Sequence, residues 1–212
     1  MSAADSPLRA FLRLAPVIPV YTPADAAEAV QVGRALQRGG LPVIEVTLRT
    51  PAALDAVRAI TAEVPDMVVA VGTVLDAAQL AAARQAGARF AVSPGATPRL
   101  LAAAREVGLP LLPGVATASE LMAAMETGLD TFKFFPAVPA GGVAMLQALA
   151  GPFPAARFCP TGGITPASAP DFLAQPNVLC IGGSWLTPKG LLAAADWPAI
   201  GQLARATATL RA

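Results

Sequence analysis

Apolar and polar positions divide the chain into two alternating kinds of segment. Short runs rich in Val, Ile, Leu and Phe, typical of buried strands, precede longer Ala-, Leu-, Arg- and Glu-rich runs with helical periodicity. The predicted strands begin near Pro16, Val43, Met67, Arg89, Pro110, Thr131, Arg157 and Val178. The predicted helices cover Ala24–Arg38, Pro51–Val64, Asp76–Ala86, Pro98–Val107, Ser119–Thr127, Gly142–Ala150, Pro166–Gln175 and Leu191–Ala208.

Proline and glycine mark the same helix boundaries. Prolines are predicted in first turns and glycines just after helix ends, at Pro51, Pro98, Pro166, Gly39, Gly87, Gly108 and Gly128. Eight βα units, roughly 21 to 27 residues apart and without a linker, predict one α/β domain over residues 1–212, a single (βα)8 TIM barrel. An extra N-terminal helix within residues 1–14 (Ala4–Leu14) is expected to close the barrel floor. An open doubly wound sheet is the alternative, but the chain offers no G-x-G-x-x-G motif for it.

Composition excludes several classes of partner. The formal net charge is +1, so the basic excess of a nucleic-acid-binding protein is absent. No apolar run reaches the roughly 18 uncharged residues that a membrane span needs, and the N-terminus lacks the pattern of a secretory signal. Cys159 and Cys180 lie in apolar runs without C-x-x-C spacing, which is typical of buried, reduced thiols. We therefore expect a cytoplasmic protein that acts on a small molecule.

The chain contains no histidine. This excludes Ser–His and Cys–His nucleophile pairs and every histidine-liganded metal site. Acid–base chemistry must come from carboxylates, lysine, tyrosine or water.

One of the two lysines stands out against thirteen arginines. Lys133 lies within Phe132-Lys133-Phe134-Phe135-Pro136, the most aromatic stretch of the chain. Burial among apolar side chains disfavours the charged ammonium, and a neutral amine is a nucleophile that forms Schiff bases. The alternative is a surface lysine whose ammonium reaches out to water.

Side-chain alternation predicts that this lysine meets a glutamate. In the strand from Val43, Glu45 and Arg49 share one face with Thr47, and in the strand from Thr131, Lys133 shares one face with Phe135. An amine and a carboxyl group inside one barrel are the minimum set for iminium chemistry. A purely structural Glu–Arg pair is the competing interpretation, although burying such a pair often yields no net stability.

The last two strands each end in a Gly-Gly pair. Gly162–Gly163 and Gly182–Gly183 expose backbone N–H groups, and a helix is predicted soon after the first pair. Barrels of this type often bind phosphate at the loops after strands 7 and 8. Either pair alone is typical of a turn, but the two together favour a phosphate site.

The chain resembles the 2-keto-3-deoxy-6-phosphogluconate (KDPG) and 4-hydroxy-2-oxoglutarate (KHG) aldolase family over roughly residues 10 to 205. The motifs that carry this resemblance are Glu45-Val46-Thr47-Leu48-Arg49, Gly72-Thr73-Val74, Val92-Ser93-Pro94-Gly95, Phe132-Lys133-Phe134-Phe135-Pro136-Ala137, Cys159-Pro160-Thr161-Gly162-Gly163-Ile164 and Ile181-Gly182-Gly183-Ser184-Trp185.

The resemblance implies a class I, metal- and cofactor-independent aldolase that assembles as a homotrimer and cleaves KDPG to pyruvate and glyceraldehyde 3-phosphate in sugar-acid breakdown. It implies that Lys133 forms the Schiff base and that Glu45 is the acid–base group, acting partly through water. The substrate-binding residues that it implies are Arg49, Thr73 and Pro94 for the carboxylate, Phe135 and Thr161 for the pyruvyl group and hydroxyls, and Gly162, Gly163, Gly183 and Ser184 for the phosphate.

Three residues depart from the family pattern beside the expected site. Val71 places a β-branched side chain that we expect to point inward, Ala116 stands where serine is frequent, and Ser168 stands where asparagine is common. Cleavage of KHG to pyruvate and glyoxylate, or of the C4-epimeric phosphogalactonate, is the enzymatic alternative. The non-enzymatic alternative is a silent barrel that binds phosphosugars.

Overall fold

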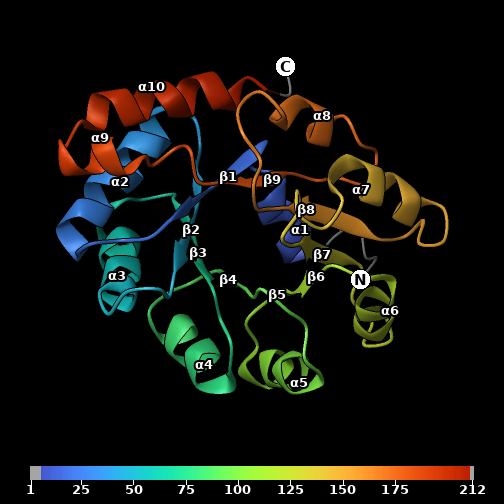
Figure 1. Cartoon of the computed structure of the whole chain (residues 1–212). Helices are drawn as coiled ribbons and strands as arrows, with labels where there is room; N and C mark the ends of the chain where they lie inside the picture. Colours follow the sequence, from blue (N-terminus) through green and yellow to red (C-terminus); the bar gives the residue numbers. More distant parts are fainter. Residues whose placement is uncertain (1–5, 211–212) are drawn as a thin grey trace.

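Parallel strands and helices alternate through residues 6–210, which the computed structural model describes (Figure 1). The strands are β1 (Val17–Tyr21), β2 (Val43–Thr47), β3 (Val68–Gly72), β4 (Phe90–Val92), β5 (Leu111–Leu112), β6 (Gly114–Val115), β7 (Thr131–Phe134), β8 (Arg157–Pro160) and β9 (Ile181–Gly183). The helices are α1 (Pro7–Leu12), α2 (Ala26–Arg38), α3 (Ala53–Glu63), α4 (Ala77–Gln85), α5 (Pro98–Val107), α6 (Ala118–Met125), α7 (Gly142–Ala150), α8 (Ala169–Leu173), α9 (Lys189–Ala193) and α10 (Trp197–Ala208).

The strands form a curled parallel sheet with helices α2 to α10 outside it, and α1 lies within their ring in this view (Figure 1). Six strands follow the order β5-β4-β3-β2-β1-β9, and three follow the order β6-β7-β8. Single bridges, Phe158 to Val178 and Thr161 to Gly182, join β8 to the segment that contains β9. Only Pro113 separates β5 from β6, and its carbonyl accepts the Lys133 N–H of β7 at 2.8 Å. The fold is therefore α/β, as predicted.

Several predicted boundaries are wrong for local reasons. The strand predicted from Pro110 is divided into two pieces at Pro113, which has no N–H for a ladder. The helix predicted over Leu191–Ala208 is two helices, because Ala195 adopts a φ of 50° and Asp196 caps the start of α10. The predicted first-turn prolines Pro51 and Pro166 lie in turns that precede α3 and α8. Pro98 does begin α5, and Gly108 ends it in the left-handed conformation.

The N-terminal helix α1 packs on the strands through both apolar and charged side chains. Leu8 and Leu12 are buried, and the Phe11 ring stacks on Phe90 of β4 with centroids 5.8 Å apart. Arg9 forms an ion pair with Asp130, just before β7. Residues 1–5 of the predicted helix lie outside the described residues.

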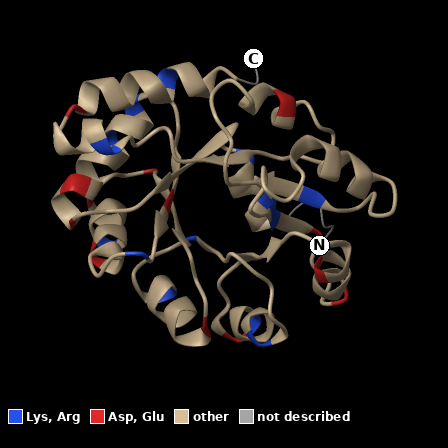
Figure 2. Ribbon diagram, in the orientation of Figure 1, with Lys and Arg blue, Asp and Glu red and all other residues tan. Residues whose placement is uncertain are grey.

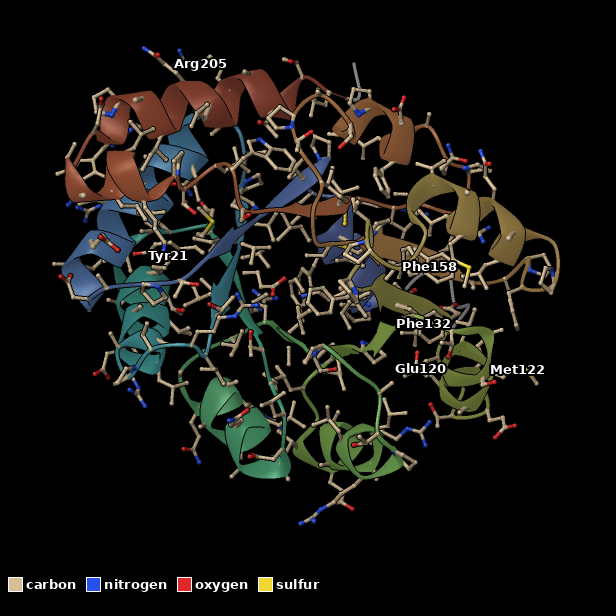
Figure 3. All side chains as sticks on the ribbon, viewed as in Figure 1. Tyr21, Glu120, Met122, Phe132, Phe158 and Arg205 are labelled. Carbon is tan, nitrogen blue, oxygen red and sulfur yellow. The ribbon has the colours of Figure 1, made fainter. Side chains whose placement is uncertain are left out.

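Phenylalanines fill the space between β7, β8 and the helices. Phe132, Phe134 and Phe158 are fully buried, and the ring centroids of Phe132 and Phe158 are 6.2 Å apart (Figure 3). The ladder pairs Phe132 with Phe158 and Lys133 with Cys159, so the phenylalanines face the helices and the lysine faces the interior. The predicted burial of both cysteines is confirmed.

Charges are interspersed around the ring of helices, with Lys and Arg near Asp and Glu (Figure 2). Within residues 6–210, no helix has the length and apolar character needed to cross a membrane.

Candidate active site

Lys133 and Glu45 meet inside the curled sheet, from β7 and β2. Lys133 Nζ donates to Glu45 Oε1 at 3.3 Å, and each side chain is only 6% exposed. Among residues 6–210, this is the only hydrogen bond that either side chain forms within the protein. The predicted inward orientation of both residues is confirmed. Such a pair places a proton donor next to a proton acceptor. Burying the two charges costs desolvation free energy, which a packed apolar core would not require.

A glycine on β3 makes room for the Glu45 side chain. A Cβ at Gly72 would lie 2.2 Å from Glu45 Oε1, closer than real Cβ contacts allow. The ladder pairs Thr47 with Gly72 and Val46 with Val71. Val71 therefore points toward the helices with Val46, and its predicted inward orientation is wrong. The side to which Val71 points depends on the register of β3 against β2, which the sequence does not give.

Arg49 and Thr73 meet at the ends of β2 and β3. Arg49 Nε donates to Thr73 Oγ1 at 3.2 Å, and Arg49 is exposed while Thr73 is half-buried. Thr73 adopts a φ of 61°, which is unusual and costly for a β-branched residue. Strained backbone of this kind concentrates at functional sites, where the surrounding structure holds it in place.

The turn after β4 brings Pro94 close to the lysine. A Cβ at Gly114 would lie 2.2 Å from the Pro94 carbonyl oxygen, so only glycine permits this approach. Gly114 is also the ladder partner of Lys133. Ser93 Oγ donates to the Gly95 carbonyl at 2.6 Å and fixes the turn. The backbone at Pro94 thus lies against β6, next to the strand that carries Lys133, and its contact with the substrate carboxylate stays a prediction.

A cleft opens over the interior pair. It is lined by Val20, Arg49, Phe135, Thr161, Gly162, Gly163, Ile164, Gly182 and Ser184. Lys133 Nζ lies 5.2 Å from the centre of the Phe135 ring, which links the buried amine to this cleft. The peptide bond that follows Phe135, to Pro136, is cis. Six of the predicted substrate-binding residues therefore surround one opening.

The second Gly-Gly pair is arranged differently from expectation. Gly182 lines the cleft, and a Cβ there would lie 2.3 Å from Thr161 Oγ1. Gly183 instead faces the Trp185 ring, and a role in binding phosphate stays a prediction. The sequence placed Gly182 in a Gly-Gly pair without singling it out as a substrate-binding residue, and it gave no indication of Val20 and Ile164. Strand alternation could have placed Gly182 on the cleft side of its strand. Val20 and Ile164 could not be distinguished from ordinary core residues, because they are apolar.

The other candidate features are outside this cleft lining. Helix α8 has five residues and begins at Ala169, well after Gly163, so it is shorter and later than predicted. Ser168 Oγ accepts the Thr165 N–H at 3.0 Å within the preceding turn. The Ala116 N–H donates to Glu120 Oε2 at 2.8 Å at the start of α6. Among residues 6–210, no group of three or more acidic or cysteine side chains is arranged to hold a metal ion.

A buried lysine beside a carboxylate, inside a curled parallel α/β sheet, is the arrangement that a Schiff-base enzyme requires. The sequence model of the aldolases that act on KDPG and KHG matches residues 8–203, so the chain belongs to the KDPG and KHG aldolase family.

Curated and solved relatives agree with this assignment. The KHG/KDPG aldolase of Escherichia coli K12 is 55% identical over 194 residues, covering 92% of this chain and 91% of that protein. The KDPG aldolase of Zymomonas mobilis ZM4, solved with 3-phosphoglycerate, has a TM-score of 0.92 at 47% identity, covering 99% of this chain and 98% of that one. The KDPG aldolase of Legionella pneumophila, solved with pyruvate captured at low pH as a covalent carbinolamine, has a TM-score of 0.94 at 43% identity, covering 96% and 99%.

Proposed function

We propose that this aldolase cleaves KDPG to pyruvate and glyceraldehyde 3-phosphate through a Schiff base on Lys133. The 3.3 Å contact between Lys133 Nζ and Glu45 Oε1, in a nearly closed interior, carries this proposal. Transfer of the ammonium proton to Glu45 leaves a neutral amine beside the substrate. The carbinolamine captured in the similar Legionella protein is the intermediate that such an amine forms with pyruvate.

The chemistry follows from these two groups. Lys133 Nζ attacks the C2 carbonyl to give a carbinolamine. Glu45 returns its proton to the carbinolamine hydroxyl, which leaves as water, and this gives the iminium and restores the Glu45 carboxylate. Glu45 removes the proton of the C4 hydroxyl, the C3–C4 bond breaks, and its electrons pass to the iminium nitrogen as the aldehyde leaves. The protonated Glu45 then gives its proton to C3 of the enamine, and water hydrolyses the resulting iminium to release pyruvate and restore the amine. The iminium is the electron sink, so no metal is required.

The polar rim positions the substrate in this proposal. Arg49 and Thr73, with the backbone around Pro94, hold the carboxylate, because a planar guanidinium grips a carboxylate through paired hydrogen bonds. Phe135 packs against the pyruvyl group, and Thr161 lies beside the carbonyl carbon and hydroxyls.

The phosphate lies at the glycine-rich end of the cleft. Gly162, Gly163, Gly183 and Ser184 hold it through backbone N–H groups and one hydroxyl. Three of these four residues line the cleft itself, while the α8 terminus contributes little because the helix is short. A phosphorylated acid, 3-phosphoglycerate, accompanies the similar Zymomonas protein.

KHG cleavage is the second candidate, since the E. coli relative is named for both substrates. The interior pair and the carboxylate grip serve either substrate, and only the phosphate contacts separate them. A silent phosphosugar-binding barrel has no use for a lysine and a glutamate brought together in its interior.

We also propose a closed (βα)8 barrel as one domain, floored by α1, in a cytoplasmic homotrimer. The bridges between β8 and β9, and the continuity of β5 and β6 across Pro113, support closure. The exposed apolar side chains of Leu75 and Met122 are suited to an interface between subunits.

Pyruvate release from KDPG and KHG, measured side by side, tests the proposal. A kcat/KM ratio of about 100 in favour of KDPG, roughly 2.7 kcal/mol of transition-state binding, is expected. Comparable values would indicate a dual-specificity enzyme, and the absence of pyruvate from both would refute aldolase activity. Borohydride with pyruvate should label Lys133 in a mass spectrum, and a chelator should leave the rate unchanged.

A further inference from the structure

The proposed carboxylate grip depends on an exposed side chain in a short turn. Arg49 lies in the turn that follows β2, and within residues 6–210 its side chain forms one hydrogen bond, from Nε to Thr73 Oγ1. A long, solvent-exposed arginine loses rotamer freedom when it binds a ligand. A site gains affinity when its scaffold restricts that freedom beforehand. Residues 48–50 are called here the Arg49 turn.

Two threonine hydroxyls clamp the Arg49 turn from both sides. Before it, Thr47 Oγ1 and Thr22 Oγ1 share a hydrogen bond of 2.8 Å, and Thr47 is completely buried. At its end, Thr50 Oγ1 donates to the Pro23 carbonyl at 2.8 Å. Both bonds reach the same stretch, residues 21–24, called here the anchor loop. The two bonds bracket Arg49 in sequence and attach its turn to the end of β1.

The anchor loop is itself fixed to α2. Glu28 Oε1 accepts hydrogen bonds from the Tyr21 hydroxyl and from the Ala24 N–H, the latter at 3.1 Å. Burial, and then the hydrogen bond to Glu28, raise the pKa of Tyr21, so the phenol remains a donor. Tyr21 is fully buried on β1 beside α2 (Figure 3). The clamp therefore connects the Arg49 turn to a rigid part of the fold.

We propose that Thr22, Thr47 and Thr50 are positioning residues that hold Arg49 ready for the substrate carboxylate. This inference rests on the proposed function and concerns keto-acid affinity rather than the chemistry at Lys133. None of the three hydroxyls is among the residues that line the cleft. Loosening the clamp should therefore raise KM for the keto acid and leave kcat nearly unchanged.

The test uses nearly isosteric replacements that remove only the hydroxyl. Thr50→Val and Thr22→Val are each expected to raise KM for KDPG by about three- to tenfold, the range of one ordinary hydrogen bond, with kcat within twofold. Thr50→Ser keeps the hydroxyl and should restore KM. Thr127→Val is the matched control, because the half-buried Thr127 hydroxyl also donates to a backbone carbonyl, of Ala124 at 2.7 Å, but at the end of α6.

A double-mutant cycle separates positioning from general loosening. In an Arg49→Ala background, Thr50→Val should change kcat/KM by less than about twofold, because the positioned group is gone. An effect that persists undiminished in that background, or that Thr127→Val reproduces, would overturn the inference. So would unchanged KM in both valine variants of an active enzyme, which would leave the proposed function intact. A wild-type protein that releases no pyruvate would overturn the proposed function and this inference together.

Discussion

Two ion pairs adjoin strand β7, one in the interior of the sheet and one at the N-terminal end of the strand, and they differ in chemistry. The interior pair, Lys133 with Glu45, rests on one contact of 3.3 Å. The other pair joins Arg9 of α1 to Asp130 at 2.9 Å, with Thr131 bonded to both: it accepts from Arg9 Nε at 3.0 Å and donates to Asp130 Oδ1 at 2.7 Å. The Arg9–Asp130 pair is thus reinforced by two hydrogen bonds to Thr131, whereas the Lys133–Glu45 pair has no such third group among residues 6–210.

The residue types explain the contrast. Arginine keeps its proton under all ordinary conditions and forms directional bonds, which suits a fixed structural contact. Lysine can lose its proton when a neighbouring group accepts it, which suits a nucleophile. A loosely satisfied Lys–Glu pair thus indicates reactivity, and a saturated Arg–Asp pair indicates structure.

The largest expected effect comes from removing the interior amine. Lys133→Ala should lower kcat/KM by about 10^4-fold or more, because no other group near the site forms an iminium. Circular dichroism should show that the variant is folded. Full activity in this variant would show that the Lys133–Glu45 pair is not the reactive pair.

Glu45→Gln should have the next largest effect. The amide keeps the shape and a hydrogen-bond acceptor for Lys133, but it cannot carry a proton. Turnover is expected to fall by about 10^2- to 10^4-fold, and exchange of pyruvate methyl protons with deuterated water should slow in parallel. Exchange at the wild-type rate would remove Glu45 from the mechanism.

Arg9→Ala should affect stability instead of chemistry. It leaves Asp130 and Thr131 without their partner, at an expected cost of about 1–3 kcal/mol, reduced from the fully buried value because Asp130 is 22% exposed. Urea unfolding measures this cost. The kcat of the folded enzyme should stay within twofold of wild type, and a large loss of kcat would contradict a purely structural role. The double variant Arg9→Met with Asp130→Asn should recover much of the stability.

Gly72→Ala tests whether the position of Glu45 beside Lys133 matters for catalysis. The added methyl meets the Glu45 carboxyl group and should displace it from Lys133. A displaced carboxyl group transfers protons less readily, so kcat/KM should fall by about 10- to 100-fold. The overpacking itself should lower the free energy of unfolding by about 1–3 kcal/mol. Gly151→Ala is the matched control, since a Cβ at Gly151, just after α7, also meets nothing within 4 Å. Equal effects at both positions would contradict the steric explanation.

The smallest effect concerns an exposed carboxylate away from both pairs. The N–H of Ala116 and then the Thr117 groups lower the pKa of Glu120 below its ordinary 4.5, against a smaller opposing effect of burial. Its contribution to stability is therefore present above about pH 4.5 and is lost as pH falls through the lower folded value. Glu120→Gln, in this capping box of α6 (Figure 3), should cost about 0.5–1 kcal/mol at pH 7 and less at pH 2. Thermal unfolding at the two pH values measures the difference, and an equal cost at both would contradict the assigned cause.

Local sequence determined much of this protein. Alternation of apolar runs placed the α/β elements, and period-two alternation within strands placed Glu45 and Lys133 on interior faces, because neighbouring side chains of a strand must point to opposite sides. The Gly-Gly pairs and the aromatic setting of Lys133 pointed to the same end of the sheet.

Tertiary structure alone decided the remainder. The register between β2 and β3 directs Val71 outward and places Gly72 beside Glu45. The register between β8 and β9 places Gly182, and not Gly183, beside Thr161 in the cleft. The hydroxyl clamp on the Arg49 turn joins residues more than twenty positions apart, which no local pattern encodes. The alternation of side chains along a strand follows from covalent geometry. The residues that lie opposite them on the next strand depend on the register between strands, which is set by how the core packs.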